Sequence, residues 1–117
     1  MPKKIFHHVG PRAFEPQPDE NYLAPSDCRV TNPIHSPYRI EFLRDGENGA
    51  ISKESRGAPH IAGVGDHLDD HLEGKELYLA PFDVDDPPFA HDAYTREDRL
   101  FAECIQFYPD YRSHVVR

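Results

Sequence analysis

A histidine followed by a glutamate, each inside its own strand-like run, occurs twice along this chain of 117 residues. The four residues and their runs are His8 in 4–10, Glu41 in 39–43, His60 in 59–64 and Glu103 in 101–107. Two imidazoles and two carboxylates are a common ligand set for a catalytic divalent metal ion. The repeated order therefore predicts a duplicated unit whose halves each donate two ligands to one site.

Glu103 carries the strongest signal of the four because of the residues beside it. Alternation along a strand places its side chain on the same face as three large apolar residues of 101–107. Burying an ionised carboxylate without a partner costs several kcal/mol or more, so we expect a cation or a hydrogen-bond donor next to it. Glu41 is a weaker signal, since Arg39 on its own strand face is an alternative partner.

The composition fits one small domain with an acidic surface. Lys and Arg number 13 and Asp and Glu 21, which gives a formal net charge of -8, and 38% of the residues are hydrophobic. An acidic surface argues against nucleic acid or an anionic membrane as a partner, because both bind basic patches. No apolar run approaches the ~18 residues of a membrane span, and no signal-like stretch follows residues 1–4. We therefore expect a cytoplasmic protein, with Cys28 and Cys104 as reduced structural thiols.

Prolines and glycines separate the strand-like runs of the first half. Segment 10–25 contains four of the prolines and is expected to be mostly loop, because each proline lacks a backbone donor and disfavours a helix. Short strands are expected at 27–31 and 38–44. The polar stretch that follows, about 46–58, is expected to be a linker between the halves.

The second half predicts the element order β-α-β-β-β. Asp66 is the expected N-cap of a two-turn helix, Leu68 and Leu72 form an i, i+4 apolar pair, and Gly74 supplies the stop. Three strands are then expected, at 76–82, 89–94 and 100–108. The first half resembles the same unit without its helix.

Four segments resemble the vicinal oxygen chelate superfamily, which includes glyoxalase I, methylmalonyl-CoA epimerase, extradiol dioxygenases, and the fosfomycin and bleomycin resistance proteins. They are 6–10, 38–43, 101–107 and, most specifically, 59–81, which reads PHIAGVGDHLDDHLEGKELYLAP. The resemblance implies an α+β fold in one domain, residues 1–117. Two β-α-β-β-β modules, about 4–45 and about 59–108, would form a curved mixed sheet around a cleft, the first module without its helix.

The same resemblance implies a function and the residues that perform it. By their place in the motifs, His8, Glu41, His60 and Glu103 resemble the superfamily's ligands for a divalent ion, which would be zinc, nickel, cobalt, manganese or iron. Having all four is most similar to glyoxalase I and the epimerase. The implied activity is that of a metal-dependent isomerase, epimerase or lyase, which would enolise a small oxygenated metabolite with Glu103 as the base. A homodimer is expected, with no nucleic acid or membrane partner.

Two other classes of function remain open. A dioxygenase would bind Fe(II) through His8, His60 and Glu103 as a facial triad and leave Glu41 unused. A binding or resistance protein would use the cleft to hold a small molecule, with or without a metal. Carboxylates turned away from the two histidines would favour the binder.

The remaining histidines are expected to have structural or surface roles. His67 and His71 are spaced i, i+4 on the predicted helix, but position 68 lacks the glutamate of a His-Glu-x-x-His protease, so an exposed helix flank is expected. Strand alternation predicts that His7 faces away from His8. Surface or core positions are also expected for four further residues: His35, His91, Tyr38 and Tyr94.

Overall fold

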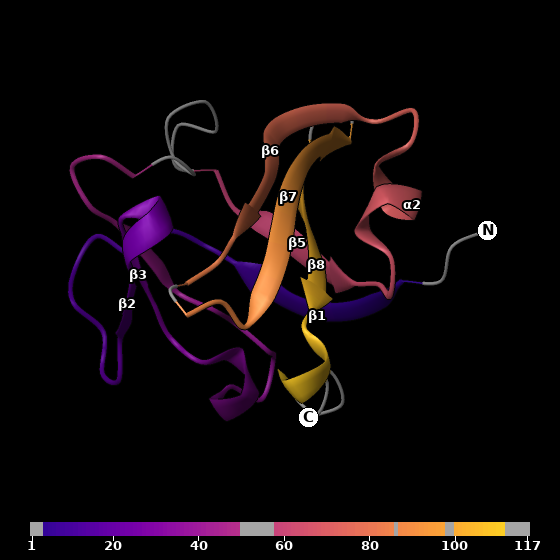
Figure 1. Ribbon diagram of the computed structural model, residues 1–117. Coiled ribbons are helices and arrows are strands. Elements are labelled where there is room, and N and C mark those ends of the chain that lie inside the picture. The colour runs from indigo at the N-terminus through magenta and orange to yellow at the C-terminus, as the bar shows by residue number, and fades with distance from the viewer. Residues whose placement is uncertain (1–3, 50–57, 86, 98–99, 112–117) are drawn as a thin grey trace.

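The fold is mostly β with one short helix, and it contains two open sheets (Figure 1). The computed structural model describes residues 4–49, 58–85, 87–97 and 100–111. The expected α+β fold with one curved mixed sheet is therefore only partly correct. In the described residues a single five-residue α-helix accompanies eight strands, and these strands form two sheets. In these same ranges, no helix is long and apolar enough to cross a membrane.

The larger sheet is mixed and the smaller one is antiparallel. In spatial order the larger sheet contains β1 (Ile5–Gly10), β5 (His60–Val64), β8 (Leu100–Phe107), β7 (Ala90–Glu97) and β6 (Glu76–Asp83). Only the pairing of β5 with β8 is parallel. The smaller sheet contains β2 (Asn21–Leu23), β3 (Cys28–Val30) and β4 (Leu43–Asp45). The helices are the 3-10 turns η1 (Ala24–Ser26) and η2 (Pro33–His35) and the α-helix α2 (Leu68–Leu72).

The same order of strand pairing recurs in the two halves. In the second half the first strand pairs with the last in parallel, and the last is followed in space by the third and the second. In the first half the segment leading into β4 runs parallel to β1, because Val9 N–H donates to the Arg39 carbonyl and Glu41 N–H donates to the Val9 carbonyl. Since β4 then pairs with β3 and β3 with β2, both halves place their first and last strands side by side.

The first half is less regular than the sequence suggests. The expected strand at 38–44 is regular only from Leu43, because Arg39 has a φ of 53° in the left-handed region and breaks the extended run. Strand β2 and the two 3-10 turns lie in stretches expected to be loop. No α-helix occurs at 4–49, in agreement with the expected loss of the helix from this half.

Helix α2 occupies the predicted place but begins differently. Its N-cap is His67 rather than Asp66, and no side chain caps it. The Leu68 N–H donates instead to the Gln106 side-chain oxygen on β8 at 2.8 Å, so a tertiary contact replaces the expected local cap. Gly74 has a φ of 75°, which is the left-handed conformation that ends a helix.

Opposite faces of the larger sheet pack against different layers. Leu68 of α2 packs on Ala93 and Cys104, and Figure 1 shows α2 on the side of the sheet away from β2 and β3. On the other face Tyr94 packs with Leu43 and other residues of the smaller sheet. Both cysteines are free and buried, as expected of structural thiols. Of the four residues singled out in the sequence, His8, His60 and Glu103 lie on this inner face, and Glu41 reaches them from the segment before β4.

Candidate metal centre

The four side chains His8, Glu41, His60 and Glu103 come together in the interior. Each offers a ligand atom, and these atoms all lie within 4.8 Å of one another although the residues span most of the chain. His8 and His60 come from the neighbouring strands β1 and β5, Glu103 comes from β8, and Glu41 comes from the segment that runs beside β1. In the described residues no other group of three or more such ligands occurs.

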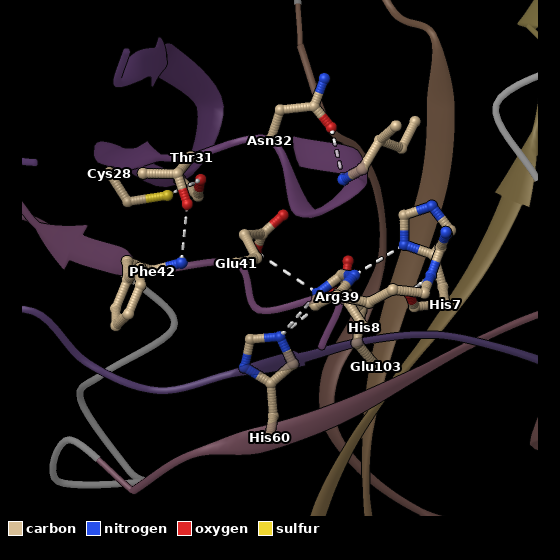
Figure 2. A network of polar contacts seen from close by, with 12 residues as sticks. His7, His8, Cys28, Thr31, Asn32, Arg39, Glu41, Phe42, His60 and Glu103 are labelled. Carbon is tan, nitrogen blue, oxygen red and sulfur yellow. Dashed lines mark hydrogen bonds and ion pairs between the residues drawn. The ribbon is translucent and has the colours of Figure 1, made fainter. Parts of the chain in front are cut away.

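His8 lies at the centre of the cluster, as Figure 2 shows. Its Nε2 atom is 3.3 Å from Glu41 Oε1 and 3.2 Å from Glu103 Oε1. The same Glu103 oxygen is 3.0 Å from His60 Nε2. The Nε2 atoms of the two histidines are themselves 3.2 Å apart. Both imidazoles and both carboxylates therefore direct a donor atom at one small volume.

These separations fit a single divalent ion. Nitrogen and oxygen ligands lie about 2.0–2.2 Å from such an ion, so two adjacent ligands at tetrahedral or octahedral angles are about 2.9–3.6 Å apart. The four separations given above, from 3.0 to 3.3 Å, fall in this range. The two carboxylates would also balance the charge of the ion. The cluster could therefore hold a metal ion if its more widely spaced ligand atoms, which lie within 4.8 Å of one another, moved closer together.

Strand register brings three of the four ligands together. His8 on β1 is opposite Ala62 on β5, and Ala62 is opposite Glu103 on β8. The small alanine between the two ligands leaves room for their side chains. His60 is two residues before Ala62, so strand alternation places it on the same face. Gly10 completes the arrangement, because a Cβ atom there would overlap the His60 ring.

His7 departs from the expectation that it faces away from His8. A register irregularity between Phe6 and His8 places an extra residue in β1, so alternation fails at this point and both histidines are buried. The Nδ1 atoms of His7 and His8 are 2.7 Å apart. His7 therefore contacts the side of His8 opposite the cluster, where it can orient the ring.

The two carboxylates set the charge of His8. Burial alone would lower the pKa of His8, but the negative charge of Glu41 and the hydrogen bond to Glu103 act in the other direction and raise it to about 10. Without a metal ion, His8 therefore carries a proton at neutral pH. The protonated imidazole occupies the place that a metal cation would take between the carboxylates.

Asp92 is a fifth buried polar group beside the cluster that the sequence argument missed. It lies on β7 with a side chain 2% exposed, and its register neighbour Ile105 is two residues from Glu103. Burial raises the pKa of Asp92 well above its usual value, and the adjacent charge of Glu103 raises it further. Burial also opposes the charge on Glu103, but hydrogen bonds from Asp92 and the two histidines hold the pKa of Glu103 well below its usual value. Asp92 therefore holds the proton and Glu103 the charge.

A small cavity of about 80 Å³ opens beside the cluster. His8, Glu41 and Glu103 line it, together with Asp92 and Tyr94. The Tyr94 ring also contacts the His60 ring edge to face, with centroids 5.4 Å apart. Three of the four candidate ligands therefore face a space in which a few further atoms can approach the cluster.

The rival histidines lie outside the cluster. His67 is exposed, as expected, but His71 is buried, and its ring lies where a Cβ on Gly65 would be. The Nδ1 atom of His91 lies 3.1 Å from Asp83 Oδ1, so its side chain pairs with Asp83 and does not join the cluster. His35 and Tyr38 are exposed, in agreement with the surface positions expected for them.

Comparison with known proteins identifies no family for this chain. No protein-family model matches the sequence, and neither does any curated protein or solved structure with which the chain was compared. The description that stands is a mixed β-sheet protein with a buried histidine and glutamate cluster resembling a metal site.

Proposed function

We propose that the chain binds one divalent metal ion through His8, Glu41, His60 and Glu103. We further propose that it uses this ion as a glyoxalase-like isomerase, epimerase or lyase that enolises a small oxygenated metabolite. The observation that carries the proposal is the convergence of the four ligand atoms within 4.8 Å of one another. Both carboxylates face the histidines, which is the arrangement expected of a metal site.

The vicinal oxygen chelate superfamily is the proposed origin of the fold. The recurrence of one strand-pairing order in both halves supports two related modules in a single domain, with a linker at about 46–58. Much of that linker lies outside the described residues, which resume at 58. Each half would contribute one histidine from its first strand and one glutamate from its last strand or the segment leading into it, which accounts for the repeated order along the sequence.

The residues of the cluster suggest how the reaction would proceed. A bound divalent ion supplies a Lewis acid that polarises a carbonyl oxygen of the substrate. His8 and His60 would present Nε2 atoms without protons, and Glu103 would accept the proton released from the carbon beside the carbonyl. Asp92, which holds a proton next to Glu103, would keep the Glu103 carboxylate charged by hydrogen-bonding to it. The packed aromatic ring of Tyr94 keeps bulk water from the same volume.

Glu41 is the alternative base. It lines the small cavity as Glu103 does, but its side chain is 15% exposed against 9% for Glu103. Glu103 contacts both histidines, whereas Glu41 forms its ion pair with His8. A carboxylate with fewer fixed contacts moves more freely between an ion and a substrate. Glu103 remains the proposed base. Comparison of the variants Glu41→Gln and Glu103→Gln in the deuterium-exchange assay would decide between the two residues.

The dioxygenase alternative uses the same residues differently. Fe(II) would be bound by His8, His60 and Glu103, and Glu41 would stay off the metal. The observation in its favour is that Glu103 contacts both histidines, whereas Glu41 forms its ion pair with His8. Iron-dependent oxygen uptake by the purified protein would favour a dioxygenase over the proposed isomerase.

Elemental analysis of the purified protein is the primary test of the metal site. We expect about one divalent ion per chain in wild type and none in His60→Ala. Catalysis is then tested by following solvent deuterium entering a 2-oxo acid, a hemithioacetal and an acyl-CoA. Metal without exchange into any of these would favour a binding protein, and wild type without metal would contradict the proposal.

A further inference from the structure

A second and larger cavity, of about 420 Å³, lies next to the small one. The two share several lining residues, including Glu41, Phe89 and Phe107. The larger cavity reaches the surface, because Tyr111 in its lining is 36% exposed. The two cavities therefore adjoin, with Glu41 in the lining of both, and the volume of the larger one is within the range of small-molecule sites.

A continuous series of aromatic rings forms one wall along the two adjoining cavities. At the inner end the His8 ring contacts the His7 ring edge to face, with centroids 5.0 Å apart. The His7 ring is 5.6 Å from that of Phe107, which stacks with Phe89 at 6.4 Å. Phe89 in turn contacts Tyr111 at 6.1 Å, at the outer end. A flat apolar group lying along this wall would be in contact with rings over its whole length.

The charges around the larger cavity are unsuited to an anion. Glu41 and Asp85 line it, and no lysine or arginine is found among the described residues of its lining. Its other polar residues include the neutral side chains of Asn21 and Asn32. An anionic group in this space would lose water and face the carboxylates of Glu41 and Asp85.

We propose that the larger cavity binds the part of the substrate beyond its metal-chelating oxygens, and that this part is an uncharged aromatic group. The inference rests on the proposed function, because the metal is what would hold the oxygen end near Glu41 and Glu103. The charges of Glu41 and Asp85 would disfavour a phosphate or carboxylate group in this position, such as that of an acyl-CoA. The substrate class is therefore a small aryl compound with two adjacent oxygens.

Hydroxamic acids provide matched probes, because they chelate a metal through two adjacent oxygens. Isothermal titration calorimetry would use protein loaded with one equivalent of Zn²⁺. The three probes are acetohydroxamic acid, benzohydroxamic acid, which adds a phenyl ring, and para-carboxybenzohydroxamic acid, which adds an anion to that ring. We expect the phenyl ring to lower Kd by at least about tenfold, since it buries apolar area. The added carboxylate should raise Kd again by at least about tenfold.

Variants of the wall locate the effect. In Phe89→Ala the ratio of the Kd values for acetohydroxamic and benzohydroxamic acid should fall toward one. Phe89→Leu, which keeps an apolar side chain and is milder to the fold, should lower the same ratio in part. Phe14→Ala is the matched control, because Phe14 is 91% exposed and is not part of either lining, and it should leave the ratio unchanged. Asp85→Asn should reduce the penalty of the added carboxylate.

The outcomes separate this inference from the proposal on which it rests. If Zn²⁺-loaded protein does not bind acetohydroxamic acid, the chelating metal centre is wrong, and the aryl pocket is overturned with it. If acetohydroxamic acid binds but the phenyl ring brings no gain, the metal centre stands and the aryl pocket is overturned. Tighter binding of the carboxylated probe than of benzohydroxamic acid would overturn the assignment of an uncharged group.

Discussion

The Nδ1 atoms of His7 and His8 lie 2.7 Å apart in the protein interior, while the Nε2 atom of His8 faces Glu41 and Glu103. One of the two Nδ1 atoms must carry the hydrogen of this contact. When His8 Nε2 binds a metal, the proton of the neutral ring resides on Nδ1, so His8 donates and His7 accepts. His7 would thus orient the ring and select the tautomer that binds metal, as outer hydrogen-bond partners of metal ligands do.

His7→Ala should therefore weaken metal binding by about 10–100-fold without removing a ligand. The change would be measured as the Kd for Zn²⁺ in competition with a chromophoric chelator. His7→Asn, which can restore an acceptor near His8, should recover part of the affinity. His67→Ala is the control, because His67 is exposed on the far side of the larger sheet. An unchanged Kd in His7→Ala would show that the contact does not orient His8.

The exchange of solvent deuterium should identify the base. Glu103→Gln keeps the shape and one oxygen ligand but removes basicity, so we expect exchange to fall by about 10²–10⁴-fold with metal still bound. Glu41→Gln should cause a smaller loss if Glu103 is the base. The reverse order of the two variants would assign the base to Glu41, and equal exchange in wild type and Glu103→Gln would contradict the role of Glu103.

Metal affinity should rise with pH. The pKa of His8 is about 10 in the metal-free protein, so at any pH below about 10 a metal must displace a proton from His8. Affinity should increase by up to about tenfold per pH unit as the pH rises toward this value. Proton release on binding, measured by calorimetry in buffers of different ionisation enthalpy, provides the check. A Kd independent of pH would show that His8 is not protonated before metal binds.

The metal-free protein should show the opposite trend in stability. The pKa of His8 is higher in the folded protein than in the unfolded chain. The protonated ring therefore stabilises the fold fully below about pH 6.5, and this contribution is lost as the pH rises through about 10. Urea unfolding of chelator-treated protein should therefore show a lower midpoint at pH 9 than at pH 7. His8→Gln, which cannot titrate, should show a smaller difference between the two pH values.

Gly10→Ala should destabilise the fold through His60. A Cβ at position 10 overlaps the imidazole of His60, and such overpacking costs about 1–3 kcal/mol of unfolding free energy. Metal binding should weaken at the same time, because the ring must move. In the His60→Ala background the same substitution should cost much less, and this double-mutant cycle isolates the contact. An equal cost in both backgrounds would place the strain elsewhere.

We also propose that the protein is a homodimer, as members of the proposed superfamily commonly are. The lean core of a small domain and the exposure of large apolar side chains such as Ile5 and Phe6 support association. Light scattering at micromolar concentration should give a mass near twice the 13.4 kDa of one chain. A mass of one chain at that concentration would contradict the proposal.

The sequence alone determined the candidate ligands and much of the second half. Strand alternation made Glu103 conspicuous, because a carboxylate on an apolar face needs a partner wherever the strand packs. Helix α2 and its end at Gly74 followed from local signals that operate within a few residues. Such patterns act over short distances and can be recognised without the rest of the fold.

The tertiary structure decided which other groups join the cluster. A bulge turned His7 inward, although alternation predicted the opposite, and bulges have no reliable local signature. Asp92 became part of the site only through its neighbour on the adjacent strand, since register between strands is set by long-range packing. Glu41 reached His8 although the backbone before it leaves the extended region at Arg39, because parallel hydrogen bonds to β1 hold that segment in place. Contacts between segments far apart in the chain, and not the residues themselves, determined these positions.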